Sequence, residues 1–549
     1  MKFFFKIFYR SPKTIIFSTI LGILAGFIYS LLIPLVTSSL DNFEGTVKHH
    51  EVSYYKILGL SVSNPKFAAT FVCMCIFVLL AKTSARALLA RVATRAASDI
   101  RQELYQKISM TPISDMDRIG ANRVHTVLTD DVARVVSSAQ RVPDLITAVV
   151  SLISMLLYIA YLNTQAFQII IKALLVGALT YGVLLRYTYK EASRPRAAID
   201  GLYDAIRGLV RGAKELKLNA IKRNMYLNLT LKEREDEFRR SYNRLVSISA
   251  AAENYGDLLA FFTIGYIAFA FTSDHLISKQ DLILLIMVLL YITAPAAMIF
   301  SAANQFSSAN VSMSRIKWLM YDLPSEILSE GIENVPRWNE IHLSNLVFSY
   351  DAVGGYSVGP INLTIRKGEL IFIVGGNGSG KSTLGKILAL HYHHDGGDFR
   401  FGDTFLLDSN RDDFRRQISA IFPDYYLFDN LPAIFNRGNY SIAKNLLTEF
   451  GLSPAVDIKA DGAFSTLDLS EGQKKRLALL MALMEDKSLY IFDEWAAEQD
   501  PEFREYFYTT ILARLRSQNK SVIVISHDDR YFHLADRVFR MKKGLIFEV

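Results

Sequence analysis

A glycine-rich run, GGNGSGKST, carries the residue types that bind a nucleoside triphosphate. It follows the apolar run ELIFIV and precedes a helical pattern, which is the context that a phosphate-binding loop (P-loop) requires. Glycines allow backbone N–H groups to wrap around phosphates, and the N-terminus of the following helix adds a favourable dipole. A glycine-rich turn without a ligand is the weaker alternative. The residues expected to contact the nucleotide are Gly375, Gly376, Asn377, Gly378, Ser379, Gly380, Lys381, Ser382 and Thr383.

Two polar side chains of the P-loop and two carboxylates further along the chain could perform the chemistry. Lys381 is expected to reach the β and γ phosphates, and Ser382 to ligate Mg²⁺. The run SLYIFDEW places Asp493 at the end of a buried strand, where it can hold Mg²⁺, and Glu494 next to it, where it can polarise the attacking water. An apolar run followed by two acidic residues is weak evidence alone and gains weight from the P-loop upstream.

The run LSEGQ, just before these carboxylates, resembles the signature of the ATP-binding cassette (ABC) transporters. The resemblance implies ATP and Mg²⁺ as cofactors, and ATP hydrolysis coupled to transport. It also implies that His527, in ISHDD, contacts the γ-phosphate of its own site and acts there with Glu494. The signature loop would instead face ATP held by the P-loop of a second subunit, through Leu469, Ser470, Glu471, Gly472 and Gln473.

Three further residues match ABC positions with differing fidelity. Asp500 matches the D-loop aspartate, although AAEQD lacks the usual small and leucine residues before it. Tyr350, in LVFSYD, matches the aromatic residue that stacks on adenine, and a core tyrosine at a strand end is the alternative. Asp424, in IFPDYYLFD, occupies the place of a glutamine that contacts Mg²⁺ and the attacking water. Aspartate keeps an oxygen ligand, so a working metal site is the better interpretation than a dead one.

The elements that position these residues include a membrane region, because the 549-residue chain is 51% hydrophobic and has a mean hydropathy of +0.20. A helix needs about 20 apolar residues to cross a bilayer. Basic residues before the first apolar run place the N-terminus in the cytoplasm. Six spans are predicted: Thr14 to Val36, Phe67 to Ala81, Leu145 to Leu162, Ile169 to Leu185, Leu245 to Phe271 and Asp281 to Phe300.

The predicted fold class is multidomain, with a six-helix transmembrane domain of the ABC exporter type followed by an α/β P-loop nucleotide-binding domain. We assign residues 1–320 to the transmembrane domain, 321–337 to a linker and 338–549 to the cassette. Two long cytoplasmic excursions turn back near TPISDMDRIGANRV and GAKELKLNAIKRN, which are the expected contacts with cassettes. Solvated helical hairpins are the alternative.

Six spans and one cassette make a half-transporter, so the resemblance implies a homodimer with two equivalent ATP sites. The phrases GAKELKLN and IFPDYYLFD resemble the branch that exports siderophores and cyclic or lasso peptides. We therefore expect ATP-driven export of a peptide-like secondary metabolite across a bacterial inner membrane. The alternatives are a lipid or multidrug exporter and a non-transporting ATP-gated regulator. A heterodimer with a second half-transporter is also open.

Glu253 and Asp257, four residues apart on one helical face of the fifth predicted span, could line the cargo path. Pairing with basic residues at an interface is the alternative. The net charge of +7 could suggest nucleic acid as a partner, yet the basic residues lie beside apolar runs. We expect membrane lipid around the spans and no nucleic-acid partner.

Overall fold

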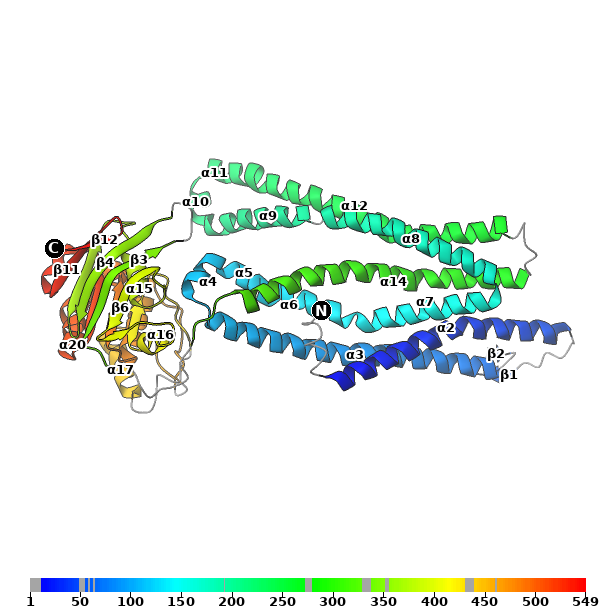
Figure 1. Cartoon of the computed structure of the whole chain (residues 1–549), viewed down its shortest axis with the longest axis horizontal. Coiled ribbons are helices and arrows are strands. Elements are labelled where there is room, and N and C mark those ends of the chain that lie inside the picture. Colours follow the sequence, from blue (N-terminus) through cyan, green and yellow to red (C-terminus); the bar gives the residue numbers. More distant parts are fainter. Residues whose placement is uncertain are drawn as a thin grey trace. The chain divides into compact units, whose positions relative to one another are not determined.

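The computed structural model (Figure 1) describes residues 11–48, 55–57, 60–62, 65–191, 193–271, 279–327, 337–350, 355–429, 439–459 and 462–549. The chain divides into two compact units. One comprises Met1–Leu104 and His125–Leu319, and the other comprises Tyr105–Val124 and Met320–Val549. The second unit therefore combines the tip of the first predicted excursion with the region that contains the P-loop.

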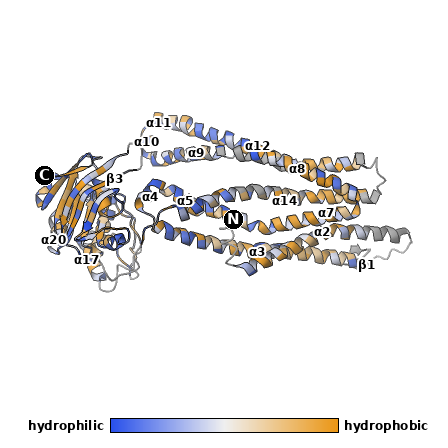
Figure 2. Cartoon of the chain, in the orientation of Figure 1, coloured by the Kyte–Doolittle hydropathy of each residue, from blue (hydrophilic) through white to orange (hydrophobic). Residues whose placement is uncertain are grey.

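The first unit is built from long helices. Figure 2 shows mostly hydrophobic residues along α2 and α7, and more hydrophilic residues along α4. Short π-helical turns interrupt the rods at η1 (Val127–Asp131), η2 (Tyr226–Leu231) and η3 (Ile267–Phe271). The helices are α2 (Pro12–Lys48), α3 (Pro65–Ser109), α5 (Ala121–Thr126), α6 (Val132–Gln140), α7 (Val142–Leu162), α8 (Thr164–Glu191), α9 (Ser193–Arg211), α10 (Ala213–Leu218), α11 (Ala220–Met225), α12 (Lys232–Tyr266) and α14 (Lys279–Lys317).

Five helical segments of the described chain are long and apolar enough to cross a membrane: Pro12–Ser39, Pro65–Ser109, Ala121–Leu162, Thr164–Val183 and Leu282–Ile299. The predicted span Leu245 to Phe271 is helical, within α12 and η3, and some of its side chains lie outside the described residues. The side chains of Glu253 and Asp257 are among those outside the described residues, so their place on the cargo path stays a prediction. A multi-pass membrane region is therefore confirmed, and the fifth predicted span, Leu245 to Phe271, stays a prediction.

Helices α2 and α7 pack closely because α2 presents two glycines four residues apart. The Thr147 hydroxyl donates to the carbonyl oxygen of Gly22 at 3.2 Å, and the Ser151 hydroxyl donates to that of Gly26 at 3.0 Å. Ala25 between them is fully buried. Small residues let membrane helices approach closely enough for such hydrogen bonds.

The second unit is an α/β structure with two sheets. A six-stranded sheet has the order β12-β11-β5-β10-β9-β8, and only β12 is antiparallel to its neighbour. A four-stranded antiparallel sheet has the order β4-β3-β6-β7. The strands are β3 (Glu340–Ser349), β4 (Ser357–Arg366), β5 (Leu370–Gly375), β6 (Gly396–Phe401), β7 (Thr404–Phe405), β8 (Ile418–Ile421), β9 (Leu489–Asp493), β10 (Ser521–Ile525), β11 (Arg537–Lys542) and β12 (Leu545–Glu548).

Helices cover the six-stranded sheet. Its central strands β5, β9 and β10 are mostly apolar and buried along nearly their whole length, as expected for parallel strands covered on both faces. In β5, Ile371 and Ile373 pack in one hydrophobic cluster, whereas Phe372 and Val374 pack in the other. The helical elements of this unit are α4 (Ile113–Ile119), α15 (Lys381–Leu388), α16 (Arg411–Arg415), α17 (Tyr440–Glu449), α18 (Glu471–Met484), η5 (Trp495–Glu498), α19 (Pro501–Tyr506), η6 (Phe507–Ile511), α20 (Leu512–Ser517) and η7 (Asp529–Leu534).

The parallel arrangement gathers the predicted chemical residues at one edge. The P-loop follows β5, Asp493 ends β9, and His527 lies two residues beyond the end of β10. These three strands are adjacent, in the order β5-β10-β9. Ligands of open α/β sheets bind at the carboxyl ends of the strands.

The glycines of α2 give a test of the helix packing. A Cβ atom at Gly26 would lie 2.7 Å from the Thr147 carbonyl oxygen, whereas one at Gly182 in α8 would meet nothing within 4 Å. Gly26→Ala should therefore destabilise the protein by about 1–3 kcal/mol through overpacking. The measurement is the apparent Tm of the purified chain in detergent, with Gly182→Ala as the matched control. An equal Tm for both variants would contradict the close packing of α2 on α7.

Candidate nucleotide site

The P-loop has the backbone that close phosphate contact demands. Gly375, Gly378 and Gly380 have φ values of +149°, +71° and +102°, a region that L-residues with a side chain rarely adopt. A Cβ atom at Gly375 would also lie 2.4 Å from the carbonyl oxygen of Met541. The loop leads directly into α15, which begins at Lys381. Its backbone N–H groups can therefore converge on an anion at the N-terminus of that helix.

Lys381 is held against the P-loop rather than extended into solvent. Its Nζ donates to the carbonyl oxygens of Gly375 and Gly376, at 2.9 and 3.1 Å. Burial lowers the pKa of Lys381, and the nearby carboxylates of Glu494 and Asp493 counteract that shift. The ammonium group of Lys381 therefore interacts electrostatically with the carboxylates of both acidic residues.

The Asp493 carboxylate is the strongest sign of a cation site. The residue is 1% exposed, and neither side-chain oxygen has a hydrogen-bond partner of normal geometry among the described residues. Burial raises the pKa of Asp493, the nearby Ser382 hydroxyl and Lys381 oppose this, and Glu494 adds to it. A buried carboxylate without a partner is costly. These residues fit Mg²⁺, which Asp493 and Ser382 would hold together with the nucleotide phosphates.

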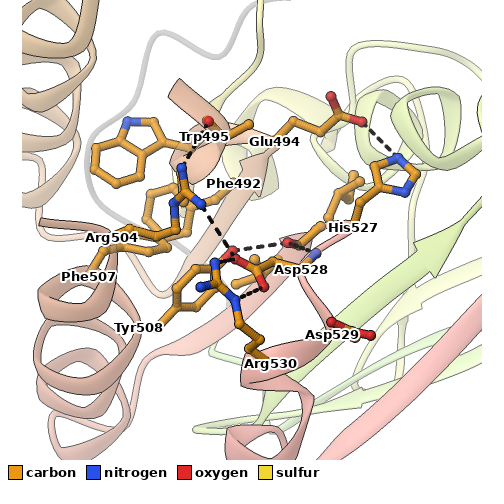
Figure 3. A pocket seen from close by; sticks show the side chains of 15 residues that line it. Phe492, Glu494, Trp495, Arg504, Phe507, Tyr508, His527, Asp528, Asp529 and Arg530 are labelled. Carbon is orange, nitrogen blue, oxygen red and sulfur yellow. Dashed lines mark hydrogen bonds and ion pairs between the residues drawn. The ribbon is translucent and has the colours of Figure 1, made fainter. Parts of the chain in front are cut away.

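Glu494 and His527 face each other at the carboxyl edge of the sheet, and Figure 3 shows their side chains in contact. His527 Nε2 lies 3.2 Å from Glu494 Oε1, and both side chains are partly exposed. Glu494 has a φ of +50°, a conformation that costs about 1–3 kcal/mol for a residue with a side chain. A hydrogen bond from its N–H to the Ile525 carbonyl oxygen, at 2.9 Å, holds this backbone.

A cavity of about 540 Å³ adjoins the P-loop and is lined by Tyr356, Glu494 and Asn377 to Thr383. Tyr356 was not among the predicted residues, although an aromatic residue just before a strand and near Tyr350 was a usable signal. Tyr350 instead hydrogen-bonds to the Thr383 hydroxyl at 3.1 Å and packs edge-on against Phe348 and Tyr392. Stacking of Tyr350 on adenine stays a prediction, and Tyr356 is a second candidate.

The signature loop, Leu469–Gln473, forms the N-terminus of α18. Ser470 is the N-cap: its hydroxyl accepts from the Gln473 N–H at 3.3 Å, and the Gln473 side chain accepts from the Ser470 N–H at 3.0 Å. Ser470 and Glu471 are exposed. The loop does not line the cavities beside its own P-loop. Its free helix terminus can bind an anion presented from outside the chain.

Asp500 and Asp424 lie in different surroundings. Asp500 caps α19 by accepting from the Phe503 N–H at 2.9 Å, and it pairs with Arg476. This backbone hydrogen bond, with Arg476, lowers the pKa of Asp500. Asp424 is exposed in a turn after β8, and its charge acts on Asp493. Asp424 thus lies close enough to the predicted metal site to interact electrostatically with Asp493, and its role as a metal ligand stays a prediction.

Helix α4, from the first excursion, contacts the cassette. The Tyr392 hydroxyl donates to Asp117 Oδ2 at 2.8 Å, and Lys386 of α15 lies 3.4 Å from the same oxygen. Because α15 begins in the P-loop, this contact joins α4 to the helix that carries the nucleotide-binding residues. The second midpoint segment forms α10 and α11 in the other unit, with Leu218 89% exposed.

Comparison with known proteins gives concordant results. The family described as ABC transporter matches residues 358–497. The chain is 32% identical over 491 residues to ATP-binding protein SyrD of Pseudomonas syringae pv. syringae, which covers 87% of each chain. It is 24% identical over 475 residues to the ATP-dependent lipid A-core flippase of Methylobacillus flagellatus, covering 83% of this chain and 79% of the flippase. It is 28% identical over 274 residues to alpha-hemolysin translocation ATP-binding protein HlyB of Proteus vulgaris, covering 47% and 37%.

The two tyrosines near the P-loop can be separated by kinetics. If Tyr356 stacks on adenine, Tyr356→Ala should raise the KM for ATP by about 2- to 10-fold, which is the loss of about 0.5–1.5 kcal/mol of stacking. Tyr356→Phe keeps the ring and should leave KM nearly unchanged. The measurement is steady-state ATPase activity of the purified chain. A larger rise in KM for Tyr350→Ala than for Tyr356→Ala would assign the adenine contact to Tyr350.

Proposed function

The chain belongs to the ABC transporter family and couples ATP hydrolysis to transport, and we propose that it exports a peptide-like secondary metabolite across a bacterial inner membrane. The cargo class includes siderophores, their precursors, and cyclic or lasso peptides. The observation that supports transport by the whole chain is the 32% identity to ATP-binding protein SyrD, which extends over 87% of the chain and so includes the membrane region. The phrases GAKELKLN and IFPDYYLFD support the same branch.

The site residues support hydrolysis by the following roles. The P-loop and Lys381 bind the phosphates, Asp493 and Ser382 hold Mg²⁺, and Glu494 polarises the attacking water. His527, within 3.2 Å of Glu494, orients that carboxylate and contacts the γ-phosphate. Bound Mg²⁺ supplies charge neutralisation for the phosphates and for the buried Asp493 carboxylate.

The exposed signature loop supports a homodimer. Ser470 and Gly472 lie at a helix N-terminus outside the P-loop cavity of their own chain. A second copy would bring this terminus onto the phosphates, and the same contact in reverse would complete the other site. ATP binding would then close two cassettes together, and the contact of Asp117 with Tyr392 and Lys386 would convey that closure to the membrane helices.

A lipid cargo is the second candidate, and two observations favour it. One relative, 24% identical over 83% of this chain, is called a lipid A-core flippase. A small apolar cavity of about 50 Å³ also lies between α8, α12 and α14, and Thr263 and Thr293 are the only residues with polar side chains among its described lining residues. Such a cavity accepts an alkyl group more readily than a charged one.

Metabolite retention tests the cargo class. Glu494→Gln should abolish hydrolysis and cause peptide metabolites to accumulate inside the cell relative to wild type. Glu235→Gln, an identical change at an exposed position of α12, should cause no accumulation. Mass spectrometry of cell extracts and medium gives the ratio. Accumulation of no peptide or siderophore in the Glu494 variant would contradict the proposed cargo, and ATPase stimulation by lipids in nanodiscs would then favour the second candidate.

A further inference from the structure

The D-loop segment Ala496–Asp500 departs from the usual ABC sequence, and its unusual glutamine makes specific contacts. Gln499 is 4% exposed. Its side-chain oxygen accepts from Arg476 Nε at 3.0 Å, and its amide nitrogen donates to the Gly472 carbonyl oxygen at 3.1 Å. Leucine, the usual residue, could make neither hydrogen bond. The glutamine therefore attaches the D-loop directly to the signature loop.

Arg504 attaches the other side of the D-loop to the histidine loop, Ser526–Asp528. Its NH2 group donates to the carbonyl oxygens of Gln499 and Ala497, at 2.9 and 3.2 Å. Its NH1 group lies 3.9 Å from Asp528 Oδ2, and Figure 3 shows the guanidinium between Trp495 and Asp528. One planar cation thus contacts two segments separated by about 30 residues of chain.

The histidine loop is held on both sides of His527. Ser526 Oγ accepts from the Asp528 N–H at 3.0 Å and lies 3.0 Å from the Tyr508 hydroxyl. Asp528 accepts from Arg530 Nε and NH2 at 2.8 and 2.6 Å. These charge-assisted hydrogen bonds from Arg530 lower the pKa of Asp528, so its carboxylate stays ionised toward Arg504.

Protein does not fill the space beside His527. A cavity of about 350 Å³ adjoins it, and its lining includes Glu494, Arg504, Asp528 and Arg530. Since packing leaves room for the imidazole to move, its position depends on the hydrogen bonds and charges of the histidine loop. A change at Asp528 would therefore move His527 relative to Glu494.

We propose that Gln499 and Arg504 are positioning residues that transmit the state of the signature loop to His527 of the same chain. The contact sequence runs from Gly472 through Gln499 and Arg504 to Asp528, which adjoins His527. The inference rests on the proposed roles of the signature loop and His527. The signature loop of each chain would contact ATP held by the other copy. ATP at one site would therefore align Glu494 and His527 at the other site. Hydrolysis is then positively cooperative in ATP concentration.

The test is the steady-state ATPase activity of the purified full-length protein in nanodiscs as a function of ATP concentration. Wild type should show a Hill coefficient above 1. Arg504→Gln should lower it toward 1 and reduce kcat about tenfold or more, because small misplacements of catalytic groups are costly. The affinity for a fluorescent ATP analogue, measured by titration, should change less than about twofold. Arg504→Lys should recover only part of the cooperativity, since an ammonium lacks the planar fork.

Three further variants distinguish transmission through Gln499 and Arg504 from a general loss of structure. Gln499→Leu keeps the carbonyl oxygen that Arg504 contacts but removes both side-chain hydrogen bonds, so it should also lower the Hill coefficient. The double variant should be no worse than Arg504→Gln alone, because both changes interrupt one connection. Arg516→Gln, at the end of α20, should leave cooperativity and kcat unchanged.

A Hill coefficient that is equal in wild type and Arg504→Gln would overturn the proposal, as would additive effects in the double variant. Loss of analogue binding in Arg504→Gln would also count against it, since that result indicates a structural role. Hydrolysis that persists in Glu494→Gln would instead contradict the assigned catalytic roles.

Discussion

The buried carboxylate of Asp493 is the constraint on which the nucleotide site depends. Two layers of apolar side chains around β5, β9 and β10 exclude water from it, and no described residue gives its oxygens a hydrogen bond of normal geometry. An uncompensated buried charge costs several kcal/mol, so the site favours a bound cation strongly. The same parallel strands that bury Asp493 also deliver the P-loop and His527 to its edge of the sheet. Folding of the apolar core and assembly of the metal site are therefore one event.

The second constraint is geometric, because the chain presents its signature loop on a surface apart from its P-loop cavity. Ser470 is occupied in capping α18, and the N-terminus of that helix is exposed. In the proposed homodimer, a second copy would supply the signature contact that the family sequence implies for a nucleotide held by one P-loop. Polar contacts connect both loops to neighbouring segments. Asp117 of α4 contacts Tyr392 and α15, and Arg504 connects the D-loop with the histidine loop. Binding, hydrolysis and movement of the membrane helices can be coupled through these few polar contacts.

Local chemistry explains what could be predicted from sequence. The P-loop and the signature loop are short, and their function requires particular residue types at fixed spacing, so each was identifiable alone. The Asp493–Glu494 pair was identifiable only because the P-loop lies upstream of it. Apolar runs likewise predicted several spans, and five helical segments of the described chain are long and apolar enough to cross a membrane. The lining role of Tyr356 depends on how β4 meets the P-loop, and the contacts of Arg504 join residues 497, 499 and 528. Both arise from tertiary structure, which spacing along one chain does not reveal.

Complementation between inactive copies tests the composite ATP site most directly. Lys381→Ala disables the P-loop but leaves the signature loop intact, whereas Ser470→Arg does the reverse. Each variant alone should lack ATPase activity, because every site in its dimer contains a defect. Co-expressed and purified as mixed dimers through two different affinity tags, the variants should regain ATPase activity, because one of the two sites is then complete; the activity should stay below half of wild type, because the defective site supplies no ATP to align the complete one. Mixed dimers that remain inactive, or Ser470→Arg copies that hydrolyse ATP normally, would contradict a site shared between two chains.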